Sequence, residues 1–329
     1  MRLASTYGAP RDGIPALTDP EFVAADDDLA SYLVPTDRVI GLHLVNEYVA
    51  IPHNILWHHE IVNLDAYDLA VTYCPFTGSS MVFQRSSVES AEFGVSGLLF
   101  ENNLVMYNRT AAEGDETLWP QMLSTGRCGP EEDESLTMFP AIEIEWGDWV
   151  ALHPDTRVVS RDTGHSRIYL RNRYPYGWDY EREDNDFTLS PLEDLDPRRP
   201  PKERLLGIAW ANGEGIAFPF GALRDAGDLV VIHETIGDGA GNQEEIVVFW
   251  DNEAVSAMAF RPWVTGQDLT FEVQDGAFTD LETGSRWSLD GEALSGPLAG
   301  QVLAMTAEAY VSFWFAFSQF VPNTEVWLP

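Results

Sequence analysis

Short runs rich in β-branched and aromatic residues recur along the chain, separated by glycine, asparagine or proline. Residues 39–51 and 69–83 are two such runs, and this composition is typical of β-strands. Helical spacing is confined to short stretches in which two aromatic residues lie three apart before a proline. Because proline ends a helix, these stretches predict short helices. We therefore predict a mainly β (α+β) fold.

The pattern of strands occurs twice. Residues 39–52 return as residues 205–219, and residues 69–74 match 245–250. In both copies an aromatic pair precedes a proline, at Trp146 and Trp149 in the first and at Trp314 and Phe317 in the second. An internal repeat of this length predicts two tandem related β-rich halves, each closed by a short packing helix.

The repeat divides the chain into four segments. We expect an N-terminal arm (1–36), a first β-rich repeat (37–159), an aromatic and proline-rich connection (160–204) and a second β-rich repeat (205–329). The connection has too many aromatic residues for a free linker. We therefore expect its Tyr174, Tyr176 and Trp178 to pack on one or both halves.

The net charge of the chain indicates the solvent conditions in which the protein works. The chain has 53 acidic and 19 basic residues, a formal charge of −34 and a single lysine. Concentrated salt screens such self-repulsion, because the Debye length falls to about 3 Å at 1 M salt. The composition therefore predicts a halophilic protein, of archaeal origin. It also argues against nucleic acid and anionic membrane surfaces as partners.

The same reading predicts a soluble, cytoplasmic protein. The N-terminus shows no signal-peptide pattern, and the most apolar window, residues 309–321, is too short to span a bilayer. Two cysteines, Cys74 and Cys128, are too few for a disulfide framework and are expected to be free thiols. The sequence names no small-molecule or protein partner, and it leaves open whether the protein is an enzyme.

A candidate site surrounds Cys74 in the first repeat. The cysteine begins a Cys-Pro-Phe-Thr-Gly turn, 15 residues after the run of His58, His59 and Glu60. At the matched positions the second copy has Trp250 in place of Cys74 and Phe220 in place of His53. Polar residues able to act as ligands are thus confined to the first copy. This is the pattern expected if one copy keeps a site and the other copy braces it.

Three interpretations of this site stay open. In a catalytic or redox site, amides of the turn would lower the pKa of Cys74, His59 or His58 would be the base, and Glu60 would orient the histidine. In a metal site, His59, Cys74 and Met106 would form a soft ligand set suited to copper. Zinc fits less well, because structural zinc needs four nitrogen or sulfur ligands and paired cysteine motifs are missing.

In the third interpretation the cysteine is a small buried hydrophobic residue, and the protein is a non-catalytic binding or interaction module. The remaining histidines are expected to be structural. Of these, His43, His165 and His233 have no suggestive surroundings, and His153 would cap the end of a helix.

Five segments together resemble the domain-of-unknown-function family 3179: residues 37–41, 52–63, 73–78, 102–107 and 153–156. The resemblance covers about residues 12 to 327, and the cysteine turn is its most specific part. Members are common in haloarchaea and in some bacteria, and no activity is established for them. Where the family often has aspartates or a second cysteine, this chain has Leu64, Asn108 and Thr77. The resemblance therefore implies neither a Cys-x-x-Cys pair nor a full set of carboxylates here.

Overall fold

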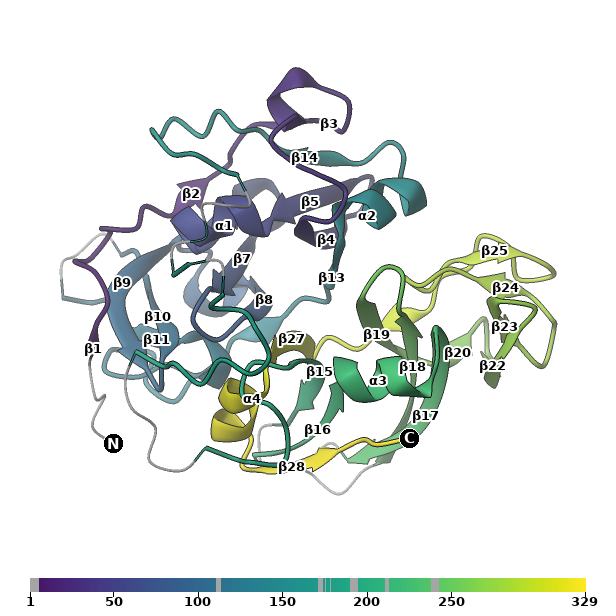
Figure 1. The fold of residues 1–329 in the computed structure, drawn as a ribbon. Helices are drawn as coiled ribbons and strands as arrows, with labels where there is room; N and C mark the ends of the chain where they lie inside the picture. Colours follow the sequence, from purple (N-terminus) through teal and green to yellow (C-terminus); the bar gives the residue numbers. More distant parts are fainter. Residues whose placement is uncertain are drawn as a thin grey trace.

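The computed structural model describes residues 6–110, 114–170, 174, 176–177, 179–189, 195–210, 213–237 and 243–329. The fold is mostly β, as predicted, and strands surround a few short helices (Figure 1). Four α-helices lie in the described part of the chain: α1 (His53–His59), α2 (Trp146–Leu152), α3 (Phe220–Ala226) and α4 (Trp314–Phe320).

The first half is built on a five-stranded sheet in the order β13-β4-β5-β14-β3. Strand β4 is antiparallel to β13 and to β5, whereas β14 runs parallel to β5. Its strands are β3 (Phe22–Ala24), β4 (Arg38–His43), β5 (Tyr48–Pro52), β13 (Ile142–Glu145) and β14 (Arg157–Val159). Helix α1 follows the extended Pro52 directly, as expected for a proline that cannot occupy a helix interior.

The second half repeats this arrangement in the order β27-β15-β16-β28, with the same strand directions. Its strands are β15 (Arg204–Ala209), β16 (Glu214–Pro219), β27 (Ala309–Phe313) and β28 (Asn323–Val326). Helix α3 follows Pro219, as α1 follows Pro52.

Individual hydrogen bonds also match between the halves. The amide of Trp146 donates to Asp37 O over 2.7 Å, and the amide of Trp314 donates to Glu203 O over 2.9 Å. The next residue of each helix donates to the oxygen of a proline, Pro35 or Pro201, in both cases over 2.8 Å. Residues 201–204 therefore hold the same place in the second half that residues 35–38 hold in the first.

The matched position of Trp250 is Tyr73 rather than Cys74. Trp250 lies on β18 (Gln243–Asp251) and packs on Phe220 with 4.9 Å between ring centroids. Tyr73 lies on β7 (Leu69–Cys74) and packs on His53 with 4.1 Å between centroids. The sequence match of Trp250 with Cys74 was therefore wrong by one residue. In a strand, a shift of one residue places the side chain on the opposite face.

Each half also contributes a three-stranded meander, and each meander lies beside the sheet of the other half. Strands β6 (Ile61–Leu64), β7 and β8 (Ser79–Gln84) share one nine-stranded sheet with β27-β15-β16-β28, through pairing of Ser80 with Val311. At the edges of this sheet are β2 (Leu17–Thr18), beside β6, and β12 (Thr137–Met138), beside β8.

The second meander consists of β17 (Leu229–Gly237), β18 and β19 (Ser256–Arg261), with β26 (Ala304–Met305) at its edge. Strand β19 meets β13 of the first half, where Ser256 Oγ donates to Glu143 O over 2.7 Å. The halves are therefore interlocked rather than two separate sheets.

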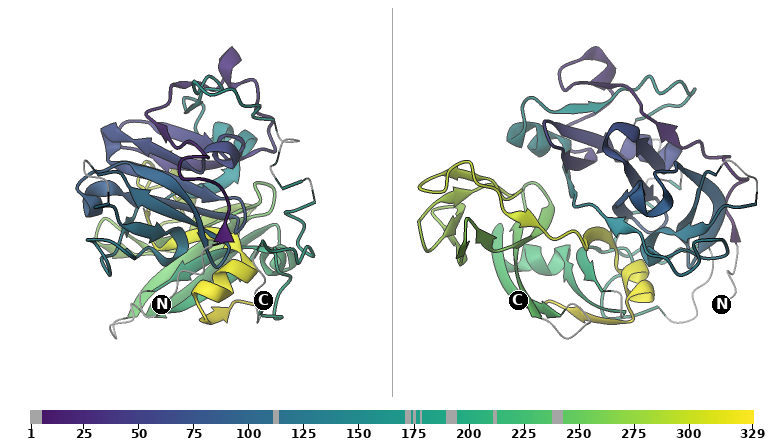
Figure 2. Two further views of the ribbon diagram at one scale, coloured as in Figure 1. Left: turned by 90° about the vertical axis from the view of Figure 1, so that its left-hand side faces the viewer. Right: turned by 180° about the vertical axis from the view of Figure 1, so that it is seen from behind.

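A further sheet extends the first half, and a lobe of two small sheets extends the second (Figure 2). The further sheet contains β1 (Thr6–Tyr7), β9 (Phe93–Phe100), β10 (Asn103–Asn108) and β11 (Leu118–Pro120). The lobe, which we call the C-terminal lobe, covers residues 263–303 and projects from the second half. One of its sheets contains β20 (Trp263–Val264) and β21 (Gln267–Asp268), and the other contains β22 (Phe271–Gln274), β23 (Ala277–Asp280), β24 (Arg286–Trp287) and β25 (Ala293–Ser295) in that order.

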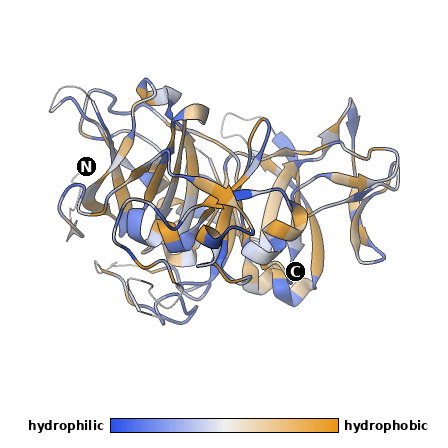
Figure 3. Cartoon of the chain, turned by 90° about the horizontal axis from the view of Figure 1, so that it is seen from above, coloured by the Kyte–Doolittle hydropathy of each residue, from blue (hydrophilic) through white to orange (hydrophobic). Residues whose placement is uncertain are grey.

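Hydrophobic residues are concentrated on the central strands (Figure 3). Two tyrosines of the connection add to this core, as expected: Tyr176 stacks on Phe76 with 4.0 Å between centroids, and Tyr174 donates to Pro75 O over 2.7 Å. Trp178 lies outside the described residues. Among the helices of the described chain, none has the length and apolarity to cross a membrane.

Close packing of each closing helix on its sheet yields a stability prediction. A Cβ atom on Gly41 would lie 2.5 Å from the Trp149 ring, and one on Gly207 would collide with the Phe317 ring. We expect Gly41→Ala and Gly207→Ala each to lower the free energy of unfolding by about 1–3 kcal/mol. Chemical denaturation measures this. The control is Gly8→Ala, where the nearest atoms are 3.7 Å away; equal stability of all three variants would contradict the packing.

Candidate functional site

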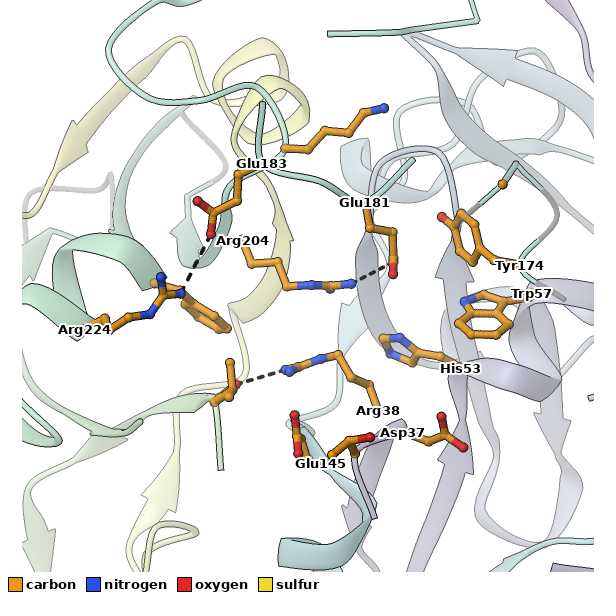
Figure 4. A pocket seen from close by; sticks show the side chains of 15 residues that line it. Asp37, Arg38, His53, Trp57, Glu145, Tyr174, Glu181, Glu183, Arg204 and Arg224 are labelled. Atoms are coloured by element: carbon orange, nitrogen blue, oxygen red, sulfur yellow. Dashed lines mark hydrogen bonds and ion pairs between the residues drawn. The ribbon is translucent and has the colours of Figure 1, made fainter. Parts of the chain in front are cut away.

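A cleft of about 540 Å³ lies where the two halves and the connection meet (Figure 4). Its wall combines cationic, acidic and aromatic side chains from all three segments. The lining residues are Thr36, Asp37, Arg38, His53, Trp57, Glu145, Tyr174, Gly177, Glu181, Glu183, Lys202, Arg204, Phe220, Arg224 and Val255. This volume suits a small ligand, since pockets of about 300–1,000 Å³ hold most small molecules.

Two matched arginines bind one buried carboxylate at the cleft. Arg38 begins β4 and Arg204 begins β15, and they lie 2.6 Å and 3.0 Å from Glu143 Oε1. Arg204 also lies 2.8 Å from Glu181. Burial alone would raise the pKa of Glu143, but the charges of Arg38 and Arg204 and a hydrogen bond with His53 hold it well below the ordinary value. Glu143 is therefore a buried anion that needs both arginines.

His53 is the first residue of α1 and is fully buried beside this carboxylate. Its Nε2 lies 3.3 Å from Ser80 Oγ and 3.4 Å from Glu143 Oε2. Burial lowers the pKa of His53, and the nearby Glu143 opposes this only in part. His53 is therefore mainly neutral near pH 7.

Two buried polar atoms on the cleft wall have no hydrogen-bond partner among the described residues: Asp37 Oδ1 and Trp57 Nε1. The two residues are 3% and 8% exposed. The other oxygen of Asp37 is satisfied, by the Val34 amide at 2.9 Å and Asn54 Nδ2 at 3.1 Å. Leaving a buried donor or acceptor unpaired costs about 1–3 kcal/mol. One unpaired acceptor and one unpaired donor therefore belong to residues of the same wall.

The second half supplies an internal comparison for Asp37. Its counterpart Glu203 is fully engaged, with Arg199 Nε at 2.6 Å and the Gly221 amide at 3.0 Å. The carboxylate is thus satisfied within the protein in one half, whereas in the other half one of its oxygens has no partner among the described residues.

Lys202, the only lysine, is fully buried at the cleft. Its Nζ lies 3.2 Å from the Tyr180 ring centroid and 3.1 Å from Asn185 Oδ1. Burial lowers the pKa of Lys202 to about 8, so the ammonium form still dominates at neutral pH. At the mouth, Arg224 pairs only loosely with Glu183, at 3.8 Å, and both side chains are about half exposed.

Cys74 does not line this cleft. Neighbouring residues of a strand point to opposite faces, and the buried Tyr73 points to the side of the cleft, where its hydroxyl lies 3.4 Å from the lining residue Glu181. Cys74 instead lies in the core with Met106 and Trp314, fully buried. The Leu104 amide donates to its sulfur over 3.3 Å. Burial and the nearby Glu60 raise the pKa of Cys74 to about 11, although Thr77 acts in the opposite direction.

The structure does not pair the predicted histidines with the thiol. His58 and His59 end helix α1 rather than lying on a strand. His59 Nδ1 lies 2.7 Å from Pro15 O and Nε2 lies 2.7 Å from Tyr169 Oη, so both ring nitrogens have partners other than Cys74. Burial lowers the pKa of His59 to about 4.

His58 is half-buried beside the Ile168 backbone and Arg167, and burial lowers its pKa as well. Among His58, His59 and Glu60, it is Glu60 whose charge raises the pKa of Cys74. It is buried, it follows α1 at φ 57°, and burial raises its pKa to about 8. Of the copper set, Met106 shares the core of Cys74, whereas His59 is bound to Pro15 and Tyr169.

Sequence reasoning missed the cleft because it looked for residues that differ between the copies. The cleft is built largely from a feature that the copies share. In each copy an acidic residue precedes an arginine, at residues 37–38 and 203–204, and a glycine follows three positions after the arginine. A buried arginine at the start of both hydrophobic hairpins was the available signal.

Comparison with known proteins identifies kin but no activity. A family model described as "Protein of unknown function (DUF3179)" matches residues 11–324, in agreement with the resemblance seen in the sequence. Neither the curated proteins nor the solved structures include a match.

The raised pKa of Cys74 predicts slow thiol chemistry. The rise of the Cys74 pKa from 9.0 to about 11 lowers the thiolate fraction near pH 7.5 by about 100-fold. We expect alkylation of Cys74 in the folded protein to be at least about 100-fold slower than alkylation of the exposed Cys128, and to accelerate as the pH rises toward 11. Mass spectrometry of timed samples measures both rates, with Cys128→Ser and Cys74→Ser to assign them. Equal rates at pH 7.5 would contradict the buried, neutral thiol.

Proposed function

Because the chain belongs to the DUF3179 family, whose function is unknown, we propose a function from the cleft itself: it binds a small polar molecule that carries both an anionic group and a hydrogen-bond donor. The observation that carries this proposal is the pair of buried, unpartnered atoms on the cleft wall, Asp37 Oδ1 and Trp57 Nε1. A ligand is the simplest partner for both.

The chemistry of the wall defines the class of ligand. Asp37 Oδ1 accepts a hydrogen bond, so the ligand needs a hydroxyl or amino group. Trp57 Nε1 donates one, and Lys202, Arg204 and Arg224 add positive charge at the same wall. The lining carries as many basic side chains (Arg38, Lys202, Arg204 and Arg224) as acidic ones (Asp37, Glu145, Glu181 and Glu183), so it favours a ligand that presents an anionic group to the former and a donor to the latter. A hydroxy acid or an amino acid has both features.

Thiol chemistry at Cys74 is a second function that we propose. It is supported by the Leu104 amide and by Thr77, whose hydrogen bonds to the sulfur favour the thiolate. Rapid alkylation of Cys74 in the folded, metal-free protein below pH 7 would support this proposal, and protection of Cys74 until unfolding would contradict it. The copper interpretation has less support, since His59 already has two hydrogen-bond partners.

We also infer that the two halves arose by duplication. The matched strand orders, the matched helix starts after Pro52 and Pro219, and the matched backbone bonds to Pro35 and Pro201 support this origin. The acidic composition supports our proposal that the protein is cytoplasmic in a haloarchaeal-type organism and does not bind nucleic acid.

Ligand binding is tested with two matched probes, L-malate and succinate, which differ by one hydroxyl group. We expect malate to bind about tenfold more tightly, because its hydroxyl can donate to Asp37 Oδ1. Asp37→Asn should reduce this preference for malate, and Arg224→Gln should lower the affinity for both probes. Isothermal titration calorimetry at constant salt measures the affinities.

The matched control is Arg286→Gln, an exposed arginine of the C-terminal lobe outside the cleft. It should bind both probes as the unmodified protein does. If neither probe binds, or if Arg286→Gln and Arg224→Gln weaken binding equally, the proposed cleft function fails.

The charge predicts salt-dependent stability. Raising KCl from about 0.1 M to about 1 M shortens the Debye length from about 10 Å to about 3 Å and weakens repulsion among the acidic side chains. We expect the melting temperature to rise by several degrees, measured by differential scanning fluorimetry. An uncharged solute at equal osmolality is the control. A melting temperature independent of KCl would contradict the halophilic interpretation.

A further inference from the structure

A second cluster of chemically active side chains lies away from the cleft, between the first half and the C-terminal lobe. His43 ends β4, His153 follows α2, and Asp290 lies in the turn between β24 and β25. Helix α2 and the lobe lie on the same side of the molecule (Figure 1). One ligand atom from each of the three residues lies within 4.8 Å of the others.

The three atoms converge on one point. His153 Nε2 lies 2.7 Å and His43 Nε2 lies 2.9 Å from the same oxygen, Asp290 Oδ2. Yet His43 Nε2 is buried and has no partner in hydrogen-bond geometry among the described residues. His153 Nε2 is hydrogen-bonded to Asp290 Oδ2, whereas His43 Nε2 approaches the same oxygen without a well-directed hydrogen bond. A shared cation would give this nitrogen a partner among the same three ligand atoms.

Surrounding groups hold these side chains in place. Tyr48 stacks on the His153 ring with 3.7 Å between centroids and meets the His43 ring edge-on at 4.9 Å. Ser288 Oγ donates to the other oxygen of Asp290. Such outer contacts orient metal ligands and are a regular part of metal sites.

We propose that His43, His153 and Asp290 bind a first-row divalent metal ion of the zinc type. Two imidazole nitrogens and one carboxylate oxygen form an N/O set that zinc accepts, and water would complete the coordination. The His43 side chain is 22% exposed, whereas those of His153 and Asp290 are 4% and 1% exposed, so the site lies nearest to solvent on the His43 side. The ion would tie the C-terminal lobe to the first half.

The test measures zinc binding to the whole chain after removal of metal with a chelator. The titration contains excess Mg²⁺ to occupy the many surface carboxylates, which prefer hard cations. We expect about one equivalent of Zn²⁺ per chain, and Co²⁺ should give the visible absorption of a site of low coordination number. Asp290→Asn should weaken zinc binding by at least about 100-fold. Zinc should also raise the melting temperature of the unmodified protein and not that of the variant.

Two controls separate this site from other thiol or histidine sites. Cys74→Ser and His165→Gln, an exposed histidine, should each keep the full equivalent of zinc. If Asp290→Asn does not fold, His43→Gln on the exposed side takes its place. Three outcomes would each overturn the proposal: zinc binding below one tenth of an equivalent in the folded unmodified protein, full zinc binding by Asp290→Asn or His43→Gln, or loss of zinc binding in Cys74→Ser.

Discussion

The arrangement depends on one buried carboxylate, Glu143, and the two arginines that neutralise it. Arg38 comes from the first half and Arg204 from the second, and both bind the same oxygen. A buried ion left without its partner costs about 3–5 kcal/mol, so neither half can move away without exposing an uncompensated charge. The carboxylate therefore fixes the interface between the halves, and the cleft forms at this interface.

Strand pairing strengthens the same interface between the halves. The meander of the first half joins the second sheet through Ser80 and Val311, and Ser256 of the second meander binds the backbone of Glu143. Because a strand pairing and a side-chain hydrogen bond both cross between the halves, the cleft walls are joined into one unit. The unpaired atoms of Asp37 and Trp57 are held on that unit in advance of any ligand, and such preorganisation favours tight binding.

The position of Cys74 shows how a local pattern can point to the right strand and the wrong face. Cys74 directly follows Tyr73, whose hydroxyl is hydrogen-bonded to the cleft residue Glu181. Alternation along β7 turns the thiol into the opposite core, where it meets Met106 and Glu60 instead of a histidine. The run of His58, His59 and Glu60 is helical at its start, so its members point in different directions. Spacing along the chain does not determine which of these side chains converge.

The sequence by itself determined the β-rich fold, the repeated hairpins and the family, because strand composition, turn residues and helix-ending prolines act locally. It also indicated the packing of Tyr174 and Tyr176. Only the tertiary structure decided that Arg38 and Arg204 share a carboxylate, and that His43 and His153 meet an aspartate 137 residues or more away in the chain. Such sites are built from long-range contacts, and their geometry exists only after strands from both halves have paired.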